Sequence, residues 1–169
     1  MNEALRARDF IVDFLRREIV GPSPGYPAIQ INREEILRAQ DPPRQRLTEL
    51  RNELLKLHTV LLASERAVYE RDVQRIRSSS QFLDLALNDP AFAWLRVLSQ
   101  LVVLIDETLE AEEAPGAAEA SRLVRRALDL LSPVESSGAF EKPYLEALQR
   151  DPEVILAHAA ALKLLRRLE

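Results

Sequence analysis

An almost entirely apolar segment that begins at an Asp–Pro pair constrains the fold of this chain more than any other feature. Asp89 precedes Pro90, and in residues 90–105 the side chains that are not apolar are Pro90, Arg96, Ser99 and Gln100. An aspartate can accept hydrogen bonds from the N–H groups of a first helical turn, and a proline there already has a helical φ. These four residues are too few to form the polar face of a surface helix. We therefore predict a central helix that neighbours cover on most sides.

The rest of the composition indicates one mostly helical domain. The chain has 169 residues, of which 47% are hydrophobic and only four are glycine. A chain of this length buries enough surface for a real core, and long segments rich in Leu, Ala, Arg and Glu favour helices. The predicted fold is all-α, a bundle of about five long and two or three short helices with an N-terminal helical arm.

The absence of cysteine and of long apolar segments excludes several classes of protein. No disulfide, thiolate metal site or cysteine nucleophile is available, because the chain contains no cysteine. Residues 90–105 are too few to span a bilayer comfortably, and Arg96 lies among them. The N-terminus lacks the apolar segment of a signal peptide. We therefore expect a cytoplasmic protein without a membrane span.

Prolines divide the chain into an arm and a bundle. Residues 22–32 contain three prolines and a glycine, which predict an ordered loop after a first helix that ends near Val20. Asn32 and Glu35 have capping-box spacing and predict a short helix over residues 33–39. Pro42 and Pro43 then form a stiff joint. The predicted domains are an arm, residues 1–43, and a helical bundle, residues 44–169.

A long helix is predicted from about Pro43 to Ile76, with leucines in a nearly heptad pattern. At 1.5 Å per residue it would reach roughly 45 Å, and a helix of that length usually pairs with another, in the same chain or in a second copy. Val103 is a second sign of contact, because it interrupts the polar stripe of the central helix. The candidate interface residues are Leu50, Leu54, Leu57, Leu61 and Val103.

The basic side of this long helix is the candidate anion-binding surface. Segment 44–77 has more basic than acidic residues, whereas the whole chain has a net charge of −4. Acidic residues interleave with the basic ones and aromatic residues are few, which favours a solvated surface over a nucleic-acid interface. The candidate anion-binding residues are Arg44, Arg51, Arg71 and Arg75.

The residues that could carry chemistry favour structural roles. The pattern around His58 predicts a half-exposed ring on a helix surface, and that around His158 predicts a partly buried ring with one hydrogen bond. Glu107 and Glu110 form an E-x-x-E pair that could hold magnesium, but no second acidic pair is available, so a solvated helix end is favoured for residues 106–113. We expect no catalytic residue, metal or cofactor.

Two segments resemble known families. Residues Asp9-Phe-Ile-Val-Asp-Phe-Leu-Arg-Arg-Glu-Ile-Val-Gly-Pro22 and Glu34-Glu-Ile-Leu-Arg-Ala-Gln-Asp-Pro-Pro-Arg-Gln-Arg46 resemble the start of large helicases from bacterial phage-defence islands. There, an aromatic, glycine-containing segment follows, whereas here Leu47 opens a helix and no helicase motor fits. Residues 47–169, especially Leu85-Ala-Leu-Asn-Asp-Pro-Ala-Phe-Ala-Trp-Leu-Arg96, resemble small uncharacterised bacterial helical proteins. The resemblances favour a bacterial source and leave the function open, and no catalytic residue can be carried over from the helicases.

These observations together predict a non-enzymatic helical protein. We expect it to act through protein–protein association, as a homo-oligomer or an accessory subunit, because the long leucine pattern offers a contact and no catalytic motif is present. The alternative is a nucleic-acid-associated accessory protein of a bacterial defence system, which rests on the arginines and on the helicase resemblance.

Overall fold

The computed structural model describes residues 12–13, 15–16, 19–20, 42–132 and 138–169, and every element that it defines there is a helix. The prediction of an all-α fold is therefore confirmed. The predicted loop at 22–32 and helix at 33–39 lie outside the described residues. None of the described helices combines the length and apolarity needed to cross a bilayer. In chain order, the elements from residue 42 onward are α3 (Pro42–Asp72), α4 (Ser79–Asn88), the 3₁₀ helix η1 (Pro90–Leu95), α5 (Arg96–Glu110), α6 (Ala117–Leu131), α7 (Glu141–Arg150) and α8 (Pro152–Leu168).

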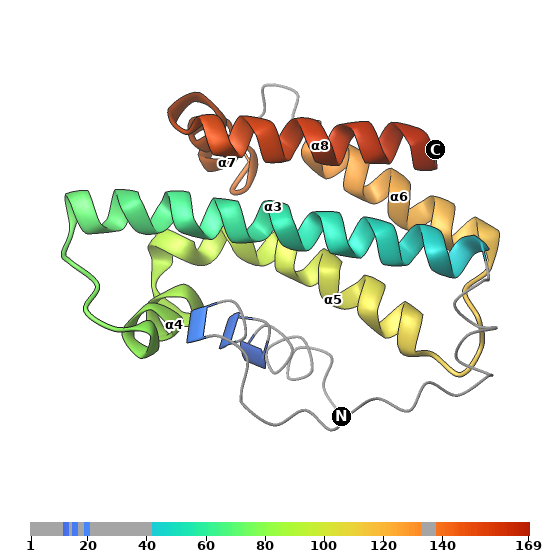
Figure 1. Cartoon of the computed structure of the whole chain (residues 1–169), viewed down its shortest axis with the longest axis horizontal. Coiled ribbons are helices and arrows are strands. Elements are labelled where there is room, and N and C mark those ends of the chain that lie inside the picture. The colour runs from blue at the N-terminus through green and yellow to red at the C-terminus, as the bar shows by residue number, and fades with distance from the viewer. Residues whose placement is uncertain (1–11, 14, 17–18, 21–41, 133–137) are drawn as a thin grey trace.

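The long helix α3 is the centre of the bundle. It runs the length of the molecule, with α8 along one side and α5 along the other (Figure 1). It contacts α5, α6, α7, α8 and η1. The leucines that follow the heptad pattern are at most 1% exposed, namely Leu47, Leu50, Leu54, Leu57 and Leu61. Because other helices of the same chain surround α3, the apolar pattern is satisfied within the chain.

Helix α3 ends at Asp72, four residues before the predicted end at Ile76. The N–H groups of Val73 and Gln74 both donate to the carbonyl of Tyr69, at 2.9 and 3.2 Å, and close the helix with a turn. The chain then folds back, the Ile76 N–H donates to Glu70 Oε1 at 3.1 Å, and the Ile76 side chain is buried. Burial of this side chain in the core outweighs the local helical propensity.

The central apolar segment is two elements and not the single helix that the pattern predicted. Asp89 Oδ1 accepts from the Ala91 N–H at 2.9 Å, which confirms the predicted cap. The first six residues form η1, and α5 begins at Arg96. Since residues three apart share one side of a 3₁₀ helix, η1 directs Phe92 and Leu95 the same way, and both are buried. The prediction that neighbours cover this segment is confirmed by seven buried residues in α5 alone.

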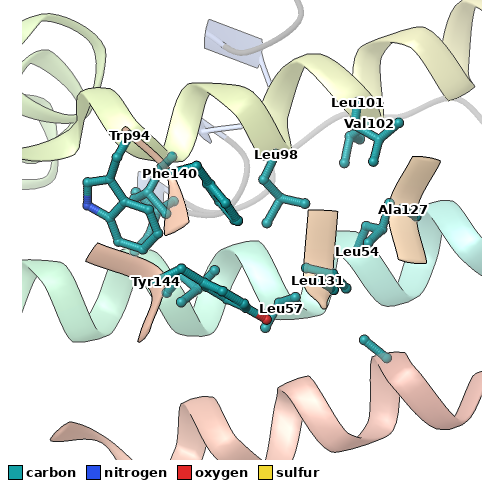
Figure 2. Packing of buried hydrophobic residues seen from close by; sticks show 14 of the residues in the cluster. Leu54, Leu57, Trp94, Leu98, Leu101, Val102, Ala127, Leu131, Phe140 and Tyr144 are labelled. Carbon is teal, nitrogen blue, oxygen red and sulfur yellow. The ribbon is translucent and has the colours of Figure 1, made fainter. Parts of the chain in front are cut away.

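Aromatic residues from distant parts of the chain meet above α3. Phe140 and Tyr144 stack with ring centroids 5.0 Å apart, and Trp94 lies 5.8 Å from Phe140. Figure 2 shows these rings beside Leu57 of α3 and Leu98 of α5. The cluster joins η1 to the start of α7, which lie about 50 positions apart in sequence. Rings in such offset and tilted arrangements add roughly 1 kcal/mol to the effect of burial alone.

The described part of the N-terminal arm packs on the chain's own bundle. Leu15 is buried and belongs to the main core. Ile19 lines a hollow of about 180 Å³ with Thr59 and Leu62 of α3 and Phe82 of α4. Figure 1 places these short helical pieces beside α4 and α5. The boundary between an arm, 1–43, and a bundle, 44–169, stays a prediction because residues 21–41 lie outside the described part.

Replacing Asp89 by Ala is expected to lower the free energy of unfolding by about 1 kcal/mol, because the start of η1 loses its cap. The carboxylate also accepts from the Tyr69 hydroxyl at 3.4 Å, so α3 loses a link to η1. Thermal and urea unfolding measure the change. The control is Asp129→Ala, since Asp129 is exposed on α6, and equal effects of both substitutions would contradict the capping role.

Candidate functional site

The predicted interface residues are in the core and not on the surface. Leu50, Leu54, Leu57 and Leu61 are at most 1% exposed, and Val103 is 5% exposed. The chain itself provides this burial, so a second copy cannot reach these side chains while the bundle is closed. The expected contact surface along α3 is therefore corrected to an intramolecular one. The physical reason is that α5, α6 and α8 together surround the heptad leucines.

The predicted anion-binding arginines do not form one site. Arg44 Nη1 donates to the carbonyl of Leu109 at 2.5 Å, and Arg51 Nε lies 2.5 Å from Asp106 Oδ1. Arg71 forms an ion pair with Asp72 at 2.6 Å, and Arg75 is exposed in the turn after α3. Because the first two lie near the start of α3 and the last two near its end, roughly 30 Å of helix separates the pairs. Arg44 and Arg51 thus link α3 to α5, and Arg71 pairs with its neighbour in sequence.

His58 is buried, which corrects the prediction of a half-exposed ring. Its side chain is 2% exposed, and Nε2 lies 2.8 Å from Ser99 Oγ on α5. Ser99 Oγ also donates to the Leu95 carbonyl at 3.2 Å, so the hydroxyl accepts from Nε2–H. In that arrangement the imidazole cannot act as a base toward the serine. Burial lowers the pKa of His58 to about 4, and the pair is a neutral link between α3 and α5.

The acidic end of α5 is solvated as predicted except at Asp106, which is buried. Asp106 is 7% exposed and paired with Arg51, whereas Glu107 and Glu110 are exposed as predicted. Within the described ranges, no group of three or more histidine, aspartate or glutamate side chains is arranged to hold a metal ion. Asp106 is therefore better explained as the partner of Arg51 than as a ligand.

His158 lies as predicted, in a half-buried position with one hydrogen bond. Its Nδ1 is 2.8 Å from the hydroxyl of Tyr144, and the two rings meet edge to face. Burial raises the pKa of the Tyr144 hydroxyl and lowers the pKa of His158. Both groups are thus neutral at pH 7, and the hydrogen bond holds α7 against α8 without a charge.

A second polar contact joins α7 to α3. Arg150 Nη2 lies 3.3 Å from both Ser64 Oγ and Glu65 Oε2. Burial raises the pKa of the Glu65 carboxyl, and the charge of Arg150 and a hydrogen bond from it act in the opposite direction. The Arg150 guanidinium pairs with the Glu65 carboxylate. We therefore interpret this contact as a structural ion pair and not as a reactive acid.

Helix α8 carries two of the large apolar residues that are exposed in the described part of the chain, Ile155 and Leu156. The inner side of α8 packs through four buried residues, Val154, Ala161, Leu165 and Leu168. On the opposite side, Ile155 is 48% and Leu156 is 65% exposed, and Ala159 and Ala160 are also exposed. In Figure 1, α8 forms the outermost layer, on the far side of α3 from α5.

Charge is divided along this same surface. Glu153 is exposed in the first turn of α8, and the last turn carries Arg166 and Arg167. Lys163 is exposed between the apolar part and these arginines, and Arg167 forms an ion pair with Glu49 at 2.5 Å. We define the outer face of α8 by its exposed residues, Glu153, Ile155, Leu156, Ala159, Ala160, Lys163, Arg166 and Arg167.

A run of apolar residues in the sequence indicates this surface. Val154, Ile155 and Leu156 are consecutive, and successive residues of a helix point about 100° apart. Three adjacent apolar residues cover about 200° of a helix, so a helix that is covered on only one side leaves at least one of them exposed. Large exposed apolar residues that gather on one element are the usual sign of an interaction site.

Comparisons with protein-family models, with curated proteins and with solved structures found no match.

Proposed function

We propose that this protein acts non-enzymatically, through protein–protein association at the outer face of α8. The observation that carries the proposal is the exposure of Leu156 and Ile155, side by side on a helix whose inner side is fully packed. Burying a leucine and an isoleucine side chain contributes roughly 2 kcal/mol each, so leaving both in water favours a partner.

The arrangement of polar residues supports a non-enzymatic role. His58 and Ser99 are buried and linked to each other, and His158 is linked to Tyr144. A general base must reach the proton it removes, and a nucleophile must reach its substrate. A buried serine that accepts from its histidine has neither property. We keep the cytoplasm as the proposed location, because the chain has no cysteine that an oxidising compartment would pair.

The nucleic-acid alternative has less support. Exposed arginines do occur on α6 and α8, but Arg122 pairs with Glu119 at 3.1 Å, Arg125 with Glu169 at 2.8 Å and Arg167 with Glu49 at 2.5 Å. Acidic partners would compete with phosphates for these guanidinium groups. The apolar part of the outer face of α8 also offers nothing to a phosphate backbone.

Site-specific photo-crosslinking in cells tests the association. A photoreactive phenylalanine analogue at position 156 is expected to give one discrete adduct, because Leu156 lies in the proposed contact. The same analogue at Val73, which is 64% exposed in the turn after α3, is the matched control and is expected to give none. Irradiation followed by denaturing electrophoresis reads out both. No adduct at 156, or the same pattern at 156 and 73, would contradict the proposal.

A further inference from the structure

We propose that the partner at the outer face of α8 is an amphipathic helix of another protein, with acidic residues in its first turn, packed antiparallel to α8. The inference rests on the proposed function and adds the chemistry and the direction of the partner. It follows from the way in which exposed apolar residues and unpaired cations share one side of α8.

Two cations of the outer face are available to a partner. Arg167 pairs with Glu49 of α3 at 2.5 Å, so its charge is used within the chain. Lys163 and Arg166 are exposed, and no acidic side chain of the described ranges forms an ion pair with either of them. These two side chains are therefore the positive charges that the outer face of α8 offers to another molecule.

The unpaired cations lie on the same side of α8 as the exposed apolar residues. At 3.6 residues per turn, Arg166 lies within about 20° of Ile155 around the helix axis. Lys163 likewise lies within about 20° of Leu156, and Ala159 lies between these two lines. The five residues cover an arc of about 100°, which is the width of the stripe through which a helix packs on a neighbour. One partner helix can therefore contact all of them at once.

The apolar and basic residues are separated along the axis of α8. The apolar pair, Ile155 and Leu156, comes first. The basic pair, Lys163 and Arg166, is centred about 14 Å further along, at roughly 1.5 Å per residue. A complementary surface has large apolar side chains at one end and carboxylates two to three helical turns away. Opposite charges that meet across a contact favour the matching partner and suppress others.

The dipole of the partner helix selects the antiparallel direction. In that direction the first turn of the partner lies beside Lys163 and Arg166. Aspartate and glutamate in a first turn also interact favourably with the positive end of their own helix dipole. In a parallel complex the same carboxylates would lie in the last turn of the partner, where the dipole opposes them. Only the antiparallel direction lets the acids stabilise both the contact and the partner helix.

The same arrangement argues against a lipid surface as the occupant. A helix that lies in a membrane interface carries apolar residues on one side and basic residues on the other, so that each kind reaches its own depth. The side of α8 opposite its outer face is packed in the core, and the cations share the exposed side with Ile155 and Leu156. A protein partner that presents both kinds of side chain fits this face better.

Charge reversal in the photo-crosslinking experiment tests the acidic partner. Lys163→Glu and Arg166→Glu are combined in the full chain that carries the photoreactive residue at position 156. The adduct is expected to fall at least about tenfold, because the carboxylates of the partner then face like charges. Arg75→Glu with Arg77→Glu makes the same change of charge in the exposed turn after α3, at the other end of the molecule from the last turn of α8 (Figure 1), and is expected to leave the adduct unchanged. An adduct that survives reversal of Lys163 and Arg166 would overturn the proposal.

Mass spectrometry of the adduct identifies the partner segment and its direction. Position 156 lies opposite the later, apolar part of an antiparallel helix. We therefore expect aspartate or glutamate two to three turns before the crosslinked residue of the partner. Acidic residues only after the crosslinked residue would overturn the antiparallel direction. A segment without acidic residues, or a second copy of this chain, would overturn the identity of the partner.

Exchange of charge between the two proteins is the reciprocal test. Replacing the mapped acids of the partner by lysine is expected to remove the adduct with the original chain. The same partner variant is expected to restore the adduct with the Lys163→Glu, Arg166→Glu chain to within about threefold of the original yield. Restoration also shows that the reversed chain is folded. If the two reversed proteins keep helical circular dichroism spectra and still do not crosslink, the charge contact is wrong.

The two proposals fail in different ways. The absence of any adduct at position 156 contradicts association at this face, and with it the proposed function. An adduct that does not depend on Lys163 and Arg166 keeps the association and overturns only the acidic partner. Vesicles of phosphatidylglycerol and phosphatidylcholine test the lipid surface, and the purified chain is expected not to cosediment with them. Cosedimentation that Leu156→Glu abolishes would overturn the protein partner in favour of a membrane.

Discussion

Truncating Leu98 to alanine lowers the free energy of unfolding by about 2–5 kcal/mol, the range for large-to-small changes in a closed core. Leu98 is fully buried between η1 and the rest of α5, and Figure 2 shows it near Leu57 of α3 and the aromatic cluster. Its neighbours Leu57 and Phe140 come from distant parts of the chain (Figure 2), so the cavity cannot close unless packed segments shift. Urea unfolding followed by circular dichroism measures the change.

Leu156→Ala is the matched control for this prediction, because it removes the same atoms from a side chain that is 65% exposed. Its effect on a dilute, monomeric sample is expected to stay within about 0.5 kcal/mol. Equal losses for Leu98→Ala and Leu156→Ala would contradict the assignment of one leucine to the core and the other to the surface. A larger loss for Leu156→Ala at high protein concentration would instead report association.

Acidification is expected to destabilise the protein through His58. Burial lowers the pKa of this ring to about 4, against 6.5 for the exposed ring of an unfolded chain. As the pH falls below 6.5, the unfolded chain therefore binds the proton first. The free energy of unfolding then decreases down to about pH 4, by about 3 kcal/mol in total at 1.36 kcal/mol per pKa unit.

Other groups titrate near the same window, so the measurement needs a matched variant. The lowered pKa of His158 acts in the same direction, whereas the raised pKa of Glu65 adds stability as the pH falls. Thermal melts of the original chain and of His58→Gln are compared between pH 7 and pH 4.5. The contributions of His158 and Glu65 are common to both proteins and cancel in the difference. A glutamine amide can still donate to Ser99 but cannot be protonated, so its melting temperature should fall less. Parallel curves for the two proteins would show that His58 does not control the acid response.

Local capping signals were the most reliable guide to the helices. Asp89 and Asp151 accept from backbone N–H groups two residues on, at 2.9 and 3.0 Å, and Ser78 accepts from Gln81 at 3.1 Å. These contacts involve only neighbours in sequence, and a capped turn is stable wherever it lies in the fold. Helix α6 begins at Ala117 without a side-chain cap, directly after a Pro–Gly pair that also marks a helix start in the sequence.

The ends of α3 and of the central helix depended on distant residues. Ile76 belonged to an uninterrupted helical pattern, yet the chain leaves the helix so that this side chain can be buried. Residues 90–95 fit an α-helix equally well in sequence, but the structure winds them as η1. In both places the energy gained by packing exceeds the small difference between local conformations. The packing energy depends on residues that are distant in sequence, so neighbouring residues alone do not predict it.

The periodicity of apolar residues could not predict the candidate site, for a similar reason. A heptad pattern identifies which side of α3 is apolar, but it does not say whether the covering helix comes from the same chain. The structure decides this for Leu54 and Leu57, which α5, α6 and α8 surround. The structure also overturns the prediction that the His58 ring is half-exposed. The ring is buried because other helices contact α3 on several sides.

The sequence by itself determined that this chain is helical, where most helices begin, and that no cysteine chemistry is available to it. Those properties follow from the side chains and their immediate neighbours, which are fixed before the chain folds. Only the tertiary structure decided which apolar residues are used internally and which remain exposed. The leucines of α3 are enclosed by three helices, whereas α8 lies on the outside of the bundle and keeps Ile155 and Leu156 exposed. Exposure depends on where every other helix lies, so it is a property of the whole fold.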